Sequence, residues 1–181
     1  MDEFERLVDT YQMRTASSVA SKLAVLMDLE QIRDPRVVRF LLKVFEDRNE
    51  PQDVRIHVLK QLRNGGGLLM LADRLPVAMS IGDVLADRST TDLRLQAAIA
   101  LGDFTEIFGV LSRLNAVCLA QDESIDLRYA AFTSLERAGP TPECIALLRQ
   151  MSNDETLGRS ARSVLSAWHI DSARPTERKT P

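Results

Sequence analysis

Apolar residues recur at helical spacing along most of the chain, and polar residues fill the positions between them. In three ungapped segments, 53–62, 92–101 and 126–135, an aspartate, an apolar residue and an arginine come first, and apolar residues follow at every fourth position. The stripes are Val54, Val58 and Leu62; Leu93, Ala97 and Leu101; and Leu127, Ala131 and Leu135. This spacing marks one face of an α-helix, and no segment alternates apolar and polar residues with period two. We therefore predict an all-α fold.

The three segments form a repeat. Their aspartates lie 39 and 34 positions apart, and weaker copies at 20–29 and 156–165 extend the series at both ends. Other amphipathic segments precede the copies, at 3–14, 35–45, 75–86, 107–120 and 142–151. We call the first helix of each pair A and the second, which carries the motif, B. Because one such pair cannot bury its apolar face alone, neighbouring pairs must stack on one another.

The Asp-apolar-Arg opening of the B helices resembles HEAT repeats, particularly the short repeats of phycobilisome-lyase-like proteins. The resemblance covers about residues 16–168, with Lys22 and Gly158 at the arginine position of the terminal copies. It implies a right-handed α-α superhelix, or solenoid, of about five helical hairpins over residues 1–170, and we expect a disordered tail at 171–181. It also implies a structural ladder of hydrogen bonds between adjacent repeats, formed by Asp53, Arg55, Asp92, Arg94, Asp126 and Arg128.

The B helices of such a superhelix line its concave side, which makes them the candidate partner-binding face. One register carried through the copies selects small and polar side chains of mixed sign, namely His57, Lys60, Gln61, Asn64, Gln96, Ile99, Asp103, Thr133 and Arg137. A nucleic-acid groove would concentrate lysine and arginine and add stacking aromatic residues, and these rows do neither. The rows suit an extended peptide or a protein helix, and they equally describe a solvated face.

The loops that join A to B within each hairpin are acidic. They hold 11 acidic and 2 basic side chains: Glu46, Asp47, Glu50, Asp53, Asp87, Asp92, Asp122, Glu123, Asp126, Asp154 and Glu155 against Arg48 and Arg88. These acids either cap the helices or steer a basic partner toward one edge of the stack. The formal net charge of the whole chain is only −3, which gives no general attraction to nucleic acid or to an anionic membrane.

One segment departs from the repeat. The first aspartate interval exceeds the second by five residues, and the excess falls in 65–76, where a triple glycine, Gly65–Gly67, precedes the apolar run Leu68–Leu71. The favoured interpretation is a longer A helix bent at Pro76, with these leucines in the core. The alternative is an exposed apolar patch used for partner docking or dimerisation.

The sequence contains no constellation typical of catalysis. His57 and His169, the only histidines, have no neighbouring metal ligands in the sequence, and Cys118 and Cys144 lie in apolar stretches where we expect burial. Two cysteines fit a reducing compartment, so we expect a cytoplasmic protein with no membrane segment. We predict a non-catalytic scaffold, without cofactor or metal, which is a monomer or weak homo-oligomer and binds a protein or peptide partner, possibly basic, but no nucleic acid. The alternatives are a phycobilin-lyase-like accessory enzyme or chaperone and, last, a HEAT-like DNA repair glycosylase.

Overall fold

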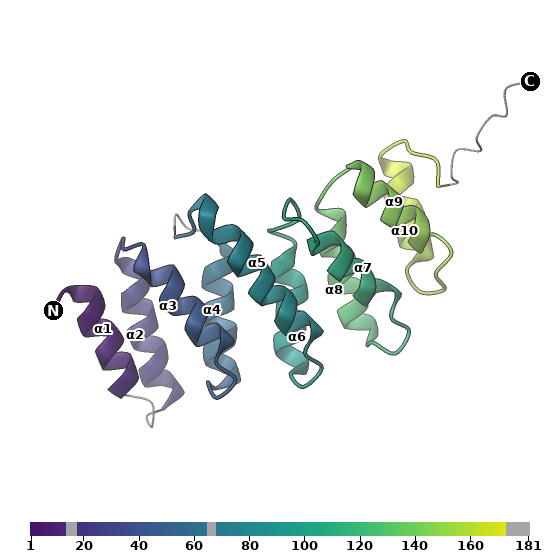
Figure 1. Ribbon diagram of the computed structural model, residues 1–181. Coiled ribbons are helices and arrows are strands. Elements are labelled where there is room, and N and C mark those ends of the chain that lie inside the picture. The colour runs from purple at the N-terminus through teal and green to yellow at the C-terminus, as the bar shows by residue number, and fades with distance from the viewer. Residues whose placement is uncertain (14–17, 65–67, 173–181) are drawn as a thin grey trace, which may run out of the picture. The chain divides into compact units, whose positions relative to one another are not determined.

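The computed structural model describes residues 1–13, 18–64 and 68–172 (Figure 1). For Asn64 it describes the backbone and not the side chain. Within these ranges the chain forms ten α-helices and no strand, which confirms the all-α prediction. The chain divides into two compact units, Met1–Ala100 and Leu101–Pro181. The predicted joint at Gly65–Gly67 and most of the predicted tail, residues 173–181, lie outside the described residues.

Unit 1 contains the first six helices. They are α1 (Glu3–Met13), α2 (Val19–Gln31), α3 (Arg36–Glu46), α4 (Gln52–Asn64), α5 (Leu71–Ala86) and α6 (Thr91–Leu101), the last residue of which belongs to unit 2. Within this unit α1 packs on α2 and α3 on α4, while α2 also contacts α4 and α3 contacts α5. Figure 1 shows α1, α3 and α5 in one layer and α2, α4 and α6 in a second. The core between them includes the fully buried Leu26, Leu41, Phe45, Leu59, Leu62 and Ile81.

Unit 2 contains α7 (Val110–Leu119), α8 (Ile125–Glu136), α9 (Pro142–Met151) and α10 (Gly158–Ala167). Here α7 packs on α8, α9 on α10, and α7 on α9. The buried Phe104, Leu114, Leu135, Leu148 and Leu165 form its core. In both units these contacts join helices that are adjacent or next but one along the chain, which is packing consistent with a helical repeat.

Local chemistry explains where several helices begin. Ser18 caps α2 and Ser124 caps α8, each by accepting a hydrogen bond from a backbone N–H three residues later. Thr141 caps α9 in the same way, and Pro142 in the first turn costs no hydrogen bond there. The helix predicted to begin near residue 107 begins instead at Val110, because Gly109 takes the left-handed φ of +86°.

The favoured interpretation placed the apolar run Leu68–Leu71 in the core, and this was wrong. Leu68 and Leu69 are half-buried, and Leu71 is 88% exposed. The reason is where α5 begins: Asp73 accepts a hydrogen bond from the Met70 N–H at 3.0 Å, so the helix begins at Leu71. Leu71 therefore stands in the first turn of α5, whereas the buried residues of this helix begin at Val77. The longer A helix was correctly predicted, since α5 has 16 residues and contains Pro76.

Candidate functional site

The three motif arginines are buried and tie each B helix to the end of its A helix. Arg55, Arg94 and Arg128 are only 5%, 6% and 3% exposed. Their Nε–H groups donate to the carbonyls of Phe45 at 2.8 Å, Leu85 at 2.8 Å and Cys118 at 2.7 Å, respectively. Each acceptor is the penultimate residue of the preceding A helix, where carbonyls lack a partner within the helix. The motif arginine therefore completes the hydrogen bonding of a buried helix end.

Arg128 also binds the loop of the following pair of helices. Its Nη2 lies 2.7 Å from Oδ2 of Asp154, and both side chains are 3% exposed. Its Nη1 lies 3.2 Å from Oγ1 of Thr156. Oδ1 of Asp154 accepts from the N–H groups of Thr156 at 2.9 Å and Leu157 at 2.8 Å. Asp154 is thus a buried counterion of Arg128 and an organiser of the turn that leads into α10.

These contacts give Asp154 a predictable effect on acid stability. Burial alone would raise its pKa, but hydrogen bonds from Leu157, Gln121 and Thr156, together with the charge of Arg128, outweigh burial and lower it from the ordinary 3.8. Because the folded-state pKa is depressed, the stabilisation is complete above the ordinary pKa and is lost as pH falls through the lowered pKa. We expect the melting temperature of the wild-type chain to fall more steeply between about pH 5 and pH 2 than that of Asp154→Asn. Parallel slopes in thermal melts of the two proteins would contradict this assignment.

The terminal copies of the repeat fill the arginine position differently. Lys22 Nζ lies 2.6 Å from Oε2 of Glu50, and the two side chains are 5% and 7% exposed. At the other end Gly158 has no room for a side chain, because a Cβ there would lie 2.7 Å from the carbonyl oxygen of Ser152. Arg162, one turn later on α10, donates from Nη1 to that same carbonyl. A basic group from α10 therefore reaches the end of α9 although the motif position is glycine.

The motif aspartates lie outside these buried contacts. Asp53, Asp92 and Asp126 are exposed, and Oδ2 of Asp92 accepts from Nε2 of Gln52 at 3.3 Å. The buried acids opposite Lys22 and Arg128 are the loop residues Glu50 and Asp154. Sequence reasoning placed both acids in the acidic loops but did not identify them as buried counterions. The continuous ladder implied by the resemblance stays a prediction.

Other acidic residues of the A–B loops shape their own turns. Oδ1 of Asp47 accepts from the N–H of Asn49 at 2.9 Å, and Oδ1 of Asp87 accepts from the N–H of Ser89 at 3.1 Å. The Ser89 hydroxyl also donates to Asp87 at 2.7 Å, and these bonds, with the charge of Arg48, lower the pKa of Asp87. Arg48 lies 3.0 Å from Asp87. These contacts favour the structural interpretation for Asp47 and Asp87, which nevertheless remain at the surface.

The predicted partner-binding residues of unit 1 lie on α4 and α6. Lys60 is exposed, whereas His57, Gln61, Gln96 and Ile99 are half-buried. His57 Nε2 lies 2.8 Å from Oε1 of Glu30 on α2, so this side chain joins two neighbouring B helices. The side chain of Asn64 lies outside the described atoms. Lys60 is therefore the side chain of this group that projects most freely into solvent.

The predicted residues of unit 2 include an ion pair. Nη2 of Arg137, at the end of α8, lies 2.5 Å from Oδ1 of Asp103. Arg137 also covers Gly102, where an added Cβ would lie 2.9 Å from its Nη1. Thr133, on α8, is exposed. The structure thus brings Asp103 and Arg137 together and leaves Thr133 available for contact.

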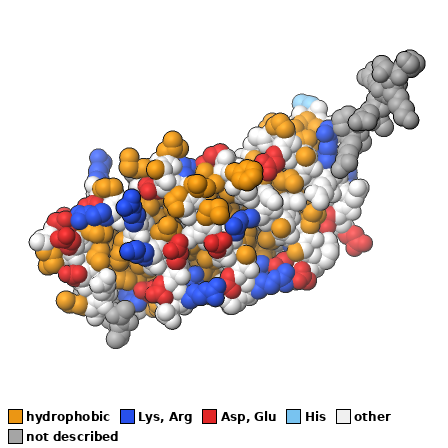
Figure 2. All heavy atoms as spheres, viewed as in Figure 1, with side chains coloured by type: hydrophobic (Ala, Val, Ile, Leu, Met, Phe, Trp, Pro, Cys, Tyr) orange, Lys and Arg blue, Asp and Glu red, His pale blue; other side chains and the backbone are white. Residues whose placement is uncertain are grey.

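An exposed apolar row on α5 was not among the predicted site residues. Leu71, Leu75 and Met79 recur every fourth residue and are 88%, 54% and 43% exposed, and Met70 before them is 64% exposed. We call these four residues the α5 stripe. Figure 2 shows hydrophobic side chains gathered over α5 on this face. The sequence did indicate this row through the apolar run Leu68–Leu71, but composition alone could not show whether these side chains face the core or the solvent.

The structure offers little nucleophile or metal chemistry in the residues it describes. Cys118 and Cys144 are buried, as predicted, and burial raises the pKa of Cys118 to about 12 and of Cys144 to about 11. No group of three or more metal-ligating side chains is assembled within the described ranges. Over the same ranges, every helix is too short or too polar to cross a bilayer. Comparison with protein-family models and with curated proteins finds no match for the chain.

Proposed function

We propose that this chain is a non-catalytic, protein-binding scaffold, built as a right-handed superhelix of about five HEAT-like hairpins. The observation that carries the proposal is the α5 stripe. Leu71, Leu75 and Met79 on α5, with Met70 just before the helix, leave apolar surface in water, and such surface is typical of a site that a protein partner covers. We infer a partner that presents an apolar face of its own to α5.

The predicted B-helix face and acidic edge form the polar part of the proposal. Lys60 and Thr133 are exposed on the two units, each on a helix anchored by a buried motif arginine. At the edge, Asp47 and the three motif aspartates are exposed and keep negative charge at the surface. We propose that this charge attracts basic groups of the partner, which makes the association rate fall as salt rises.

The test of the proposal removes the apolar row without disturbing the core. Leu71→Ser with Leu75→Ser is expected to abolish capture of a specific partner from native lysate and to leave the melting temperature nearly unchanged, because both side chains are largely exposed. The matched control is Met27→Ser, which removes a 56% exposed apolar side chain from α2. Photo-crosslinking from residue 75, read by mass spectrometry, identifies the partner and its contact.

Two outcomes would contradict the docking face. If the double variant captures the same partner as the wild-type chain, the α5 stripe is not the contact. If the crosslinks from residue 75 join only copies of this chain, and light scattering gives a dimer that the double variant lacks, the stripe serves self-association instead.

A further inference from the structure

A cleft of about 470 Å³ opens between α1 and α3 in unit 1. Phe4, Val8 and Tyr11 line it from α1 at helical spacing, and Phe40 and Val44 line it from α3. The ring of Phe40 makes edge-to-face contacts with Phe4 at 6.4 Å and with Tyr11 at 5.4 Å between centroids. The floor of the cleft is therefore apolar and aromatic.

The α3 side of the cleft is basic. Arg36, Arg39 and Lys43 follow one another along this helix and line the cleft, and Figure 2 shows lysine and arginine side chains over α3. Arg36 is already engaged, with Nη2 at 2.7 Å from Asp2 and 2.6 Å from Asp34. Arg39 and Lys43 are exposed and have no ion-pair partner among the described residues. Two positive charges thus remain uncompensated along this rim.

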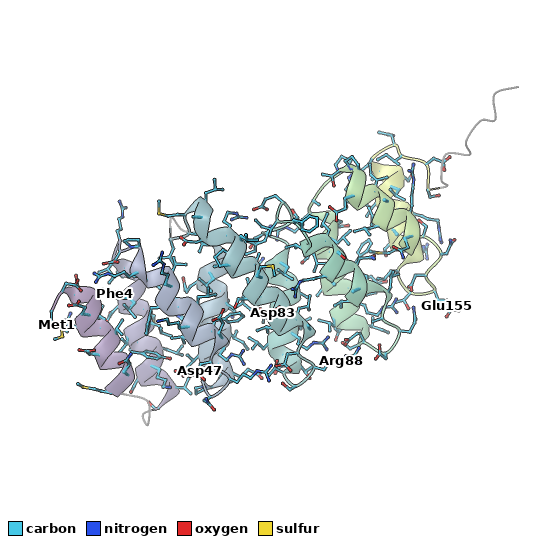
Figure 3. The ribbon with its side chains drawn as sticks, in the orientation of Figure 1. Met1, Phe4, Asp47, Asp83, Arg88 and Glu155 are labelled. Carbon is cyan, nitrogen blue, oxygen red and sulfur yellow. The ribbon has the colours of Figure 1, made fainter. Side chains whose placement is uncertain are left out.

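The acidic groups of the cleft lie at its far end and are occupied. Figure 3 labels Phe4 and Asp47, which lie toward opposite ends of the cleft. Glu50 is buried against Lys22, and Asp47 accepts hydrogen bonds from the backbone and the side chain of Asn49. The lining contains no other carboxylate. The charge that a ligand meets along the open rim is therefore positive.

We propose that this cleft binds an acidic amphipathic helix of a protein partner. Two adjacent helices leave a groove into which a third helix packs, and apolar anchors at every third or fourth position suit the apolar floor. Carboxylates beside those anchors would face Arg39 and Lys43, which supplies charge complementarity. A membrane surface is flat and fits a concave cleft poorly. The inference does not depend on the α5 stripe, because the cleft is formed by a different pair of helices.

The experiment uses a defined probe and the full chain. A fluorescein-labelled helical peptide with leucine at every third or fourth position and glutamate beside each leucine is titrated, and fluorescence anisotropy reports binding. We expect Arg39→Glu with Lys43→Glu to weaken binding at least about tenfold, because like charges then face one another. The matched control, Arg88→Glu with Arg159→Glu, makes the same charge change at exposed positions outside the cleft and is expected to leave binding within about twofold.

Further peptides, vesicles and variants distinguish an acidic amphipathic helix from other ligands that could occupy the cleft. Peptides with lysine for glutamate, or with alanine for leucine, are expected not to bind. Equal binding of the lysine peptide, or no effect of the reversal at Arg39 and Lys43, overturns the proposal. So does an Arg39- and Lys43-dependent affinity for phosphatidylserine vesicles without affinity for the peptide. If the variant Leu71→Ser with Leu75→Ser still binds the peptide, the cleft proposal is supported independently of the α5 proposal. If that variant loses peptide binding while the charge reversal at Arg39 and Lys43 does not, the cleft proposal is wrong.

Discussion

Replacing Arg128 with methionine is expected to lower the free energy of unfolding by about 3–5 kcal/mol, because it breaks a buried ion pair from one side. Asp154 would keep its charge in a position only 3% exposed, without its cationic partner. The carbonyl of Cys118 would also lose the Nε–H donor at 2.7 Å. Each loss removes a hydrogen bond that offsets the desolvation of a buried group.

The measurement is urea denaturation followed by the fluorescence of Trp168, the only tryptophan, which lies in the same unit as Arg128. Arg159→Met is the matched control, because Arg159 is exposed on α10, and its effect is expected to stay within about 0.5 kcal/mol. Arg128→Met with Asp154→Leu is expected to be more stable than Arg128→Met alone, since no buried charge is left behind. A loss below about 1 kcal/mol in the single variant would show that the pair is hydrated in solution.

The helices could be predicted because their signal is local. The apolar stripes of segments 53–62, 92–101 and 126–135 fall within α4, α6 and α8, and the capping residue Thr141 with Pro142 marks the start of α9. The errors came where a single residue sets the start of a helix. Gly109 delays α7, and Asp73 starts α5 at Leu71, so that Leu71 stands in an exposed first turn.

The buried counterions could not be predicted for a different reason. Glu50 and Asp154 lie in loops with several other carboxylates, and nothing in the sequence distinguishes an acid that faces the preceding B helix from one that faces water. The α1–α3 cleft could not be predicted either, because it depends on which helices pack together. Phe4 and Phe40 are distant in sequence, and their contact follows from how α1 and α3 pack. Packing partners are a tertiary property that periodicity within one helix does not encode.

Lys22 provides the second large prediction, in unit 1. Its ammonium group stands at the motif arginine position, pairs with Glu50 at 2.6 Å and lies 5.4 Å from the centre of the Tyr11 ring. Lys22→Met would leave the Glu50 carboxylate buried beside Tyr11, whose pKa is raised by burial and by Glu50 itself, so the phenol stays neutral and supplies no charge. The expected loss is about 3–5 kcal/mol in the free energy of unfolding.

Hydrogen exchange read by mass spectrometry locates this loss, which should appear as faster exchange in α1, α2 and α4 while unit 2 keeps its protection. Arg6→Met is the matched control, because the side chain of Arg6 forms an exposed pair with Glu3 at 4.0 Å and should change stability by less than about 0.5 kcal/mol. Lys22→Met with Glu50→Leu is expected to recover most of the lost stability, since apolar side chains of similar volume replace a desolvated pair. If the double variant is as unstable as the single one, Lys22 stabilises the fold through its packing against Tyr11. In that case the ion pair with Glu50 is not the reason for a basic residue at the arginine position of this repeat.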